Sequence, residues 1–137
     1  MFKTMLVEDN VIFRDSLRDS LRLKFPSMEI AEAGNSVEAL AKIASFSPNL
    51  IFMDIRLPGQ NGLALTEMIK KLYPGIIIII LTSYDIPEYR EAAARFKADY
   101  FFSKDSMTSE EVITLVKSIL SEKGLRANGS NGGSNKT

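Results

Sequence analysis

The sequence contains no cysteine, no histidine and no tryptophan among its 137 residues. Without cysteine the chain can form no disulfide and carries no thiol nucleophile, which fits a reducing compartment. Without histidine it cannot carry a phosphohistidine, a Ser-His-Asp triad or a histidine metal site. Any metal ion must therefore be held by oxygen ligands.

Net charge is also absent, because 17 basic residues balance 17 acidic ones. This composition supplies no basic field for non-specific nucleic-acid binding, so the chain by itself is not expected to bind DNA. Residues 1–10 are unlike a signal peptide, and the apolar run Ile76–Leu81 is far shorter than the ~20 residues that span a bilayer. We therefore expect a soluble cytoplasmic domain with its own core and no membrane contact.

The stretch around Asp54 organises the rest of the chain. Four apolar residues, Leu50–Met53, form a run without alternation, as in a strand buried on both faces of a parallel sheet. Pro58 and Gly62 then make the chain turn sharply, so that the next helix can begin only beyond them. Asp54 is thus expected at the carboxyl end of a strand, where open parallel sheets bind ligands.

Short apolar runs alternate with amphipathic segments along the whole chain. Strands are expected at residues 4–7, 28–33, 50–53, 76–81 and 99–102, with a helix after each. This pattern predicts an α/β fold with a doubly wound, five-stranded parallel sheet, helices on both faces and right-handed crossovers.

Several details of the helices follow from caps and spacing. Asn10 is expected to cap the first helix, where Leu23 widens the apolar face. The last helix is expected to begin at Thr108 or Ser109 and to end at Gly124. Residues 1–122 would then form the domain, and residues 123–137 a flexible tail or a cut linker. The second helix is expected to present an apolar face formed by Val37, Leu40, Ile43 and Ala44.

Polar residues follow four of the predicted strands at one edge of the sheet: Glu8, Asp9, Asp54, Thr82, Ser83 and Lys104. Three carboxylates within ~4 Å would repel by about 4 kcal/mol per pair at an effective dielectric of ~20, so a cation is needed among them. Hard oxygen ligands of this kind suit Mg²⁺. Lys104 supplies a second, mobile positive charge.

Asp54 is the strongest candidate for covalent chemistry. A carboxylate can attack phosphorus when a metal ion and a lysine neutralise the incoming oxygens, which gives an aspartyl phosphate. Asp54 is central and alone on its loop, whereas the neighbours Glu8 and Asp9 are better placed to hold the metal. Each residue by itself has an ordinary explanation as a turn former, a cap or a solvated side chain. Their coincidence at four strand ends favours function.

In combination these residues resemble the receiver domain of two-component response regulators. The resemblance covers about residues 3–122 and implies a flavodoxin-like (βα)5 fold with the strand order 2-1-3-4-5. The features that carry it are the Glu8-Asp9 pair, Asp54 with Pro58 and Gly62, Thr82-Ser83, and Lys104 behind the aromatic Phe101.

The resemblance also implies a role for each of these residues. Asp54 would be the phosphoacceptor, and Glu8, Asp9 and the backbone carbonyl of Arg56 would hold Mg²⁺ together with it. Thr82 and Lys104 would contact the phosphoryl group, and Phe101 would be the switch aromatic that turns inward as Thr82 moves. Such a chain is a signalling domain that catalyses only its own phosphorylation and dephosphorylation.

Partners follow from the same resemblance. A sensor histidine kinase would supply the phosphoryl group, and the fourth helix, fifth strand and fifth helix would form the face that switches. A homodimer on phosphorylation is a further expected partner. DNA would be contacted only through an output domain outside these residues. The chain is either a stand-alone receiver or the receiver part of a longer regulator, and we favour the second.

Two positions depart from the commonest pattern of the family. Asp105 stands where many members have proline, and Tyr100 stands where glycine is frequent. Asp105 and the segment 84–89 resemble the subfamily whose receivers precede a helix-turn-helix DNA-binding domain. Arg56 and Tyr84 lie two residues past Asp54 and Thr82. They are either solvated surface or bulky groups that obstruct the hydrolytic water and so lengthen the lifetime of the acyl phosphate.

Three alternative functions are weaker. A haloacid-dehalogenase-like phosphatase needs a second acid two residues past Asp54, where this chain has Arg56. A flavodoxin-like nucleotide-binding module needs a glycine-rich phosphate loop after the first strand, where Glu8 and Asp9 stand instead. A receiver that binds partners without phosphorylation would not need the intact set of acids, threonine and lysine.

Overall fold

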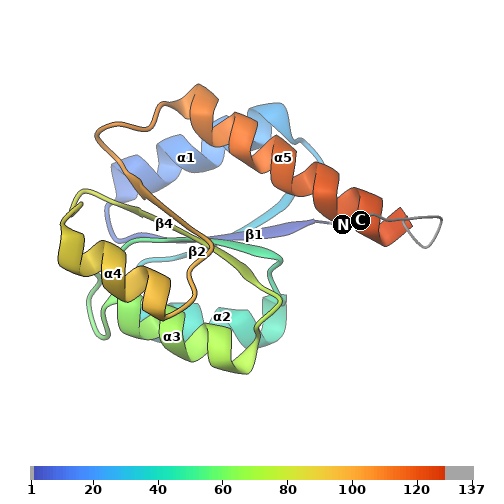
Figure 1. Cartoon of the computed structure of the whole chain (residues 1–137). Coiled ribbons are helices and arrows are strands. Elements are labelled where there is room, and N and C mark those ends of the chain that lie inside the picture. Colours follow the sequence, from blue (N-terminus) through green and yellow to red (C-terminus); the bar gives the residue numbers. More distant parts are fainter. Residues whose placement is uncertain (1, 129–137) are drawn as a thin grey trace. The chain divides into compact units, whose positions relative to one another are not determined.

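The computed structural model describes residues 2–128, and the side chains of residues 2–122. Within these residues, five parallel strands alternate with five helices in the sheet order β2-β1-β3-β4-β5, which confirms the predicted fold (Figure 1). The unit up to Met107 is compact, and α5 belongs to a second unit that is described by itself. The elements are β1 Lys3–Val7, α1 Val11–Lys24, β2 Glu29–Ala33, α2 Ser36–Phe46, β3 Leu50–Met53, α3 Gly62–Leu72, β4 Ile77–Thr82, α4 Pro87–Arg95, β5 Tyr100–Ser103 and α5 Ser109–Asn128.

The strand register brings the chemistry-bearing residues to one edge. Val7 at the end of β1 pairs with Met53 at the end of β3, so the residues that follow them, Glu8 and Asp54, leave the sheet side by side. Thr82 at the end of β4 pairs with Ser103 at the end of β5, which places Lys104 at the same edge. The predicted edge is therefore a consequence of register.

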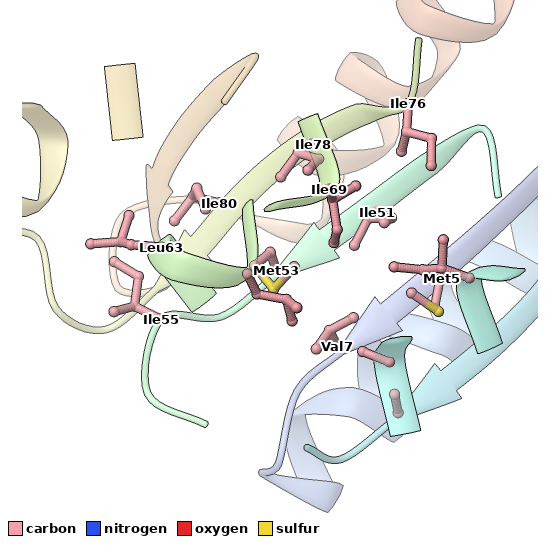
Figure 2. Close-up of a cluster of buried hydrophobic side chains, with 14 of the residues drawn as sticks. Met5, Val7, Ile51, Met53, Ile55, Leu63, Ile69, Ile76, Ile78 and Ile80 are labelled. Atoms are coloured by element: carbon pink, nitrogen blue, oxygen red, sulfur yellow. The ribbon is translucent and has the colours of Figure 1, made fainter. Parts of the chain in front are cut away.

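A buried apolar cluster lies between the sheet and the helices α2, α3 and α4 (Figure 2). Figure 1 shows α1 on the opposite side of the sheet from α2 and α3. Burying one such aliphatic side chain stabilises the fold by about 1.5–3 kcal/mol, so this cluster fixes the three helices on the sheet. The strands contribute Met5, Val7, Ile51, Met53, Ile78 and Ile80, and the helices Ala39, Ile43, Leu65, Ile69 and Ala93.

Asparagine caps determine where three of the helices begin. The Asn10 side chain accepts a hydrogen bond from the backbone N of Phe13, as predicted, and Asn35 does the same for α2. Asn61 accepts from two backbone N–H groups of α3. Each cap satisfies donors that the helix itself leaves free. In α4, Pro87 occupies the first turn instead, where its missing N–H costs nothing.

The start of α3 differs from the prediction. The helix begins at Gly62 itself, behind the cap Asn61, and not beyond that glycine. Gly62 approaches the Asp54 loop so closely that its backbone N donates to the carbonyl of Ile55 at 2.8 Å. The glycine is therefore a contact of the loop with the helix and not a break between them.

The apolar face of α1 was predicted too wide. Leu23 is 78% exposed, whereas Leu21 is fully buried. Two residues correspond to about 200° around a helix, so these two leucines cannot face the same layer. Leu23 therefore adds nothing to the core.

The buried face of α2 was predicted only in part. Ile43 is buried as expected, but Val37 is 74% exposed, Leu40 37% exposed, and Ala44 is exposed as well. The other two buried positions are Ser36 and Ala39, each one residue, or about 100°, before the expected Val37 and Leu40. The reason is tertiary. The backbone N of Ser36 donates to the carbonyl of Pro58 at 3.3 Å, and its hydroxyl accepts from the backbone N of Gln60 at 2.8 Å.

The last helix is longer than predicted. Thr108 caps α5 in a reciprocal box, because its backbone N donates to Glu111 Oε1 at 2.8 Å and its hydroxyl accepts from the backbone N of Glu111 at 3.1 Å. Gly124 does not end the helix, which continues to Asn128. A glycine costs a helix only about 1 kcal/mol relative to alanine, and no proline follows. The part of the predicted tail at residues 129–137 lies outside the described residues.

None of the helices in residues 2–128 has an apolar stretch long enough to cross a membrane.

We predict that Gly62→Ala destabilises the fold strongly. An added Cβ would overlap the carbonyl oxygen of Asp54 and lie 2.8 Å from its carbonyl carbon, so backbone must move. The expected loss is about 2–4 kcal/mol in the free energy of unfolding, measured by urea denaturation. Gly75→Ala is the control, because nothing lies within 4 Å of its added Cβ. Equal stability of the two variants would contradict the role of Gly62.

Candidate functional site

Three carboxylates meet at the carboxyl edge of the sheet. Glu8 and Asp9 follow β1, Asp54 follows β3, and one oxygen from each lies within 4.8 Å of the other two. Glu8 is 5% exposed and Asp54 is 6% exposed, whereas Asp9 is exposed. The cluster therefore has two buried carboxylates and one that faces solvent.

Lys104 lies against the two buried carboxylates. Its Nζ is 2.6 Å from Glu8 Oε1 and 3.1 Å from Asp54 Oδ2. The ammonium also lies 4.4 Å from the centre of the Phe13 ring, in a cation–π contact. Its side chain is only 11% exposed, so the charge that was predicted to be mobile is held in place.

The electrostatics of the site differ for the acid and the base. Burial raises the pKa of Glu8, and the negative charge of Asp54 adds to this, against the lowering effects of Lys104 and of a backbone hydrogen bond. Burial alone would lower the pKa of Lys104, but the two carboxylates raise it above its ordinary value. The single ammonium thus gains two partners, while each carboxylate also faces a like charge.

This imbalance has a consequence for stability. An acid whose pKa is raised on folding lowers the stability of the native state as the pH rises through its unfolded pKa, because its charged form is disfavoured. When its three carboxylates are ionised, the site has more negative than positive charge, because Lys104 supplies one ammonium. A further cation beside these carboxylates would relieve it.

Backbone groups orient the buried carboxylates. The backbone N of Asn10 donates to Glu8 Oε2 at 3.0 Å, and the backbone N of Ile55 donates to Asp54 Oδ1 at 2.7 Å. Asp54 thus has one oxygen bound to the backbone and the other facing Lys104. Its carboxylate plane is restrained before any ligand arrives.

Thr82 and Ser83 lie at the end of β4 but contribute differently. Thr82 is fully buried, and its hydroxyl accepts a hydrogen bond from the backbone N of Tyr84 at 3.2 Å. Ser83 is exposed. Among the described residues, the Thr82 hydroxyl makes no hydrogen bond to Asp54 or Lys104, so its contact is with the loop that follows β4.

Arg56 and Tyr84 come together although they belong to different loops. The Arg56 guanidinium carbon lies 4.0 Å from the centre of the Tyr84 ring, and both side chains are exposed. The sequence predicted a shared role for the two residues but not this contact. Stacked in this way, they form one bulky group at the edge of the site.

Phe101 lies on β5, opposite Ile80 of β4. Its side chain is half-buried and packs against the main apolar cluster. The predicted switch aromatic is therefore neither fully inside nor free on the surface.

Two residues of the site were missed from the sequence. Phe13 lies under the Lys104 ammonium, and Arg14 donates from Nη1 to the backbone carbonyl of Glu8 at 2.7 Å while its Nε reaches Glu32 at 3.1 Å. A signal for Phe13 was present, because it is the first inward position of the helix that follows the acid pair. Arg14 gave no signal, since one partner follows β1 and the other lies on β2, and only the folded sheet brings them together.

The carboxylate cluster can hold a metal ion. Mg²⁺ prefers an octahedron of oxygens at about 2.1 Å, in which opposite ligands lie about 4.2 Å apart. The three oxygens all lie within 4.8 Å of one another, so the carboxylates that such a site needs are gathered in one place. The set contains no nitrogen or sulfur donor, as a hard cation requires.

Comparison with known families gives a clear match. The family described as response regulator receiver domain matches residues 4–119. The chemotaxis protein CheY of Halobacterium salinarum is 36% identical over 103 residues, which are 74% of this chain and 83% of CheY. The transcriptional regulatory protein LnrK of Bacillus subtilis is 29% identical over 119 residues, which are 87% of this chain. The chain spans about half of LnrK, 54% of its length.

Solved structures show the same similarity. A CheY-like response regulator receiver domain protein from Methanospirillum hungatei JF-1 superposes with a TM-score of 0.83 at 28% identity, over 92% of this chain and 98% of that one. A DNA-binding response regulator of the LuxR family from Staphylococcus aureus gives a TM-score of 0.80 at 27% identity, over 87% and 98%.

We predict that Lys104→Met destabilises the metal-free protein. The variant leaves Glu8 and Asp54 facing each other without the ammonium, which should cost about 3–5 kcal/mol in EDTA. Asp54→Asn removes one of the two repelling charges, so the double variant should lose less than the sum of the single losses. Urea unfolding of the four proteins in a double-mutant cycle measures this coupling. Strict additivity would contradict the proposed electrostatics.

Proposed function

Because the chain belongs to the response regulator receiver domain family, we propose that Asp54 accepts a phosphoryl group from a sensor histidine kinase. The observation that carries this proposal is the environment of one carboxylate. Asp54 is buried at a strand end, lies 3.1 Å from Lys104 Nζ and belongs to a cluster that can hold a metal ion. These are the two positive charges that phosphoryl transfer to a carboxylate requires.

Glu8, Asp9 and Asp54 would hold Mg²⁺, together with the backbone carbonyl of Arg56. When bound, Mg²⁺ would neutralise oxygens of the incoming phosphoryl group. Its charge would also offset the negative charge that Lys104 alone leaves unbalanced. The raised pKa of Glu8, which is due mainly to burial, agrees with a site that favours an added cation.

Asp54 would act as the nucleophile. The hydrogen bond from the backbone N of Ile55 restrains the carboxylate, so that one of its oxygens can attack phosphorus while the bond to the leaving group breaks. Lys104 would donate to an oxygen of the transferred group. The protein would act on itself only, in phosphorylation and dephosphorylation, and on no other substrate.

Phosphorylation would switch the protein through Thr82 and Phe101. The new group places about −1.5 to −2 charges at Asp54, with three strong acceptor oxygens. Thr82 would donate its hydroxyl to one of them and draw its loop inward, and Phe101 would fill the space that the loop vacates. A coupling of about 1–3 kcal/mol is typical of such switches, so the active form should already be visited without phosphorylation.

The output would lie in another domain. LnrK is a transcriptional regulatory protein about half of which this chain matches, and the Staphylococcus aureus neighbour is a DNA-binding response regulator. By analogy, this chain would be the cytoplasmic receiver part of a longer transcription regulator. It would dimerise on phosphorylation and reach DNA only through that further domain.

We predict that incubation with acetyl phosphate and Mg²⁺ adds one phosphoryl group, seen by intact mass. Asp54→Asn should abolish the gain, because it removes the proposed nucleophile, whereas Glu8, which also contacts Lys104, would be engaged in holding the metal. Asp19→Asn is the matched control, since that side chain is 69% exposed on α1, and it should be phosphorylated like wild type. No gain in the wild-type protein under any condition would favour a receiver that binds partners without phosphorylation.

We also predict a shorter acyl-phosphate lifetime in Arg56→Ala and Tyr84→Ala. Removing either half of the stack should admit the hydrolytic water and speed loss of the phosphate about two- to tenfold, and the double variant should be no faster than the more affected single one. Decay is followed by mass after removal of the donor. Tyr73→Ala is the control, because this tyrosine is 42% exposed, like the 40% of Tyr84, but lies at the end of α3. Decay at the wild-type rate in both variants would exclude this role.

A further inference from the structure

Arg90 on α4 contacts two other parts of the molecule at once. Its Nε donates to Asp85 Oδ1 at 2.6 Å and its Nη2 to Asp85 Oδ2 at 3.0 Å. Its guanidinium carbon also lies 4.7 Å from the centre of the Phe101 ring on β5. One side chain thus joins the loop after β4 to the aromatic of the neighbouring strand.

Asp85, the loop residue that Arg90 contacts, lies close to Thr82 along the chain. Asp85 is three residues past Thr82, in the loop that follows β4. Among the described residues, its carboxylate makes hydrogen bonds only to Arg90, and these hold the pKa of Asp85 below its usual range. Two parallel bonds fix the plane of the guanidinium as well as its position. A movement of the loop must therefore move or release Arg90.

The second contact of Arg90 is with Phe101, the proposed switch aromatic. Phe101 packs against the apolar cluster on one side, and the Arg90 side chain, which is 51% exposed, covers it toward solvent. A ring between a packed core and a fixed guanidinium has fewer positions open to it than a ring beside a mobile side chain. The position of Phe101 then depends on whether Asp85 holds Arg90.

We propose that Asp85 and Arg90 are positioning residues that hold Phe101 in its half-buried position and connect that position to the loop of Thr82. The inference rests on the proposed function, in which this loop and this aromatic move together. It adds a direct link between the two: when Thr82 draws the loop inward, Asp85 is displaced, Arg90 loses its fixed plane, and Phe101 is free to turn.

The contacts of Arg90 with Asp85 and Phe101 are weak enough to break when the loop moves. Both side chains of the ion pair are partly exposed, at 51% and 34%, so solvent weakens the pair. A cation–π contact at an exposed site is likewise modest. Together they can shift a two-state equilibrium only about three- to tenfold, which a phosphoryl group can overcome.

A second arginine on the same helix provides a matched control. Arg95 lies 5.1 Å from the Phe96 ring, so it has the same charge and the same type of aromatic contact. Among the described residues it forms no ion pair, and no hydrogen bond or cation–π contact joins it to Phe101 or to the loop after β4. Arg95→Ala therefore repeats the chemical change of Arg90→Ala but leaves the contacts of Arg90 with Asp85 and Phe101 in place.

The test follows the ring itself. We would incorporate 4-fluorophenylalanine at position 101 and record fluorine NMR with relaxation dispersion, in EDTA and without a phosphoryl donor. Asp85→Ala and Arg90→Ala should raise the population of the second ring position about three- to tenfold, and Arg95→Ala should match wild type. Arg90→Lys should lie between, because it keeps a cation but loses the planar fork.

Asp85→Ala is the deciding variant. Arg90→Ala removes a guanidinium that lies beside the ring, so it changes the fluorine signal directly, whatever the ring does. Among the described residues, the Asp85 side chain is hydrogen-bonded to Arg90 alone, so a changed ring signal in Asp85→Ala reports the loss of that pair. About 1 M salt should shift the wild-type protein toward the Asp85→Ala spectrum, since it screens the exposed pair. An Asp85→Ala spectrum with the shift and exchange of wild type would overturn the proposal.

Adding acetyl phosphate and Mg²⁺ to the same samples separates the two ideas. If no phosphoryl group is gained, the proposed function fails, while the donor-free spectra still test the positioning of Phe101. If Asp54 is phosphorylated and the donor-free spectra of wild type and Asp85→Ala coincide, only the positioning role fails. If the variants shift the ring in the direction that phosphorylation shifts it in wild type, both stand.

Discussion

The structure depends on like charges held close together at the edge of the sheet. Glu8 and Asp54 are buried and follow neighbouring strands. Among the described residues, Lys104 is the cation within ion-pair distance of both. Such an arrangement is stable only if the ammonium is fixed, because a buried carboxylate that loses its partner is costly. The β1–β3 and β4–β5 registers and the Phe13 ring fix it together. The same imbalance that strains the site makes it suitable for a metal ion and a phosphoryl group.

The loop that carries Asp54 also determines how two helices pack. Gly62 lets α3 begin directly against the carbonyl of Asp54, and Ser36 turns one face of α2 toward Pro58 and Gln60. Packing and chemistry are therefore connected. The loop is held from two sides, by α2 and by the start of α3, so the elements that pack the fold also support the Asp54 carboxylate.

Sequence patterns predicted the strands, and the gathering of Glu8, Asp9, Asp54 and Lys104 at one edge of the sheet, because both follow from where apolar runs end. Fully buried strands such as Leu50–Met53 are continuous apolar runs, and their ends are marked by charged residues. The helix faces were predicted less well. Spacing alone could not decide that small residues, Ser36 and Ala39, would be the inward positions of α2, since that choice depends on a loop more than 20 residues away in the chain. Gly124 misled for a related reason, because a glycine permits a helix end but does not require one.

The sequence by itself determined the alternation of strands and helices and the residue types at the strand ends. Both are local: periodicity and charge placement can be seen without knowing any partner. Only the tertiary structure decided which atoms meet. Lys104 lies between Glu8 and Asp54, Arg56 stacks on Tyr84, and Arg90 joins Asp85 to Phe101. Lys104 and Asp54, for example, are 50 positions apart in the chain, and no pattern of spacing specifies the distance between two side chains that register and packing bring together.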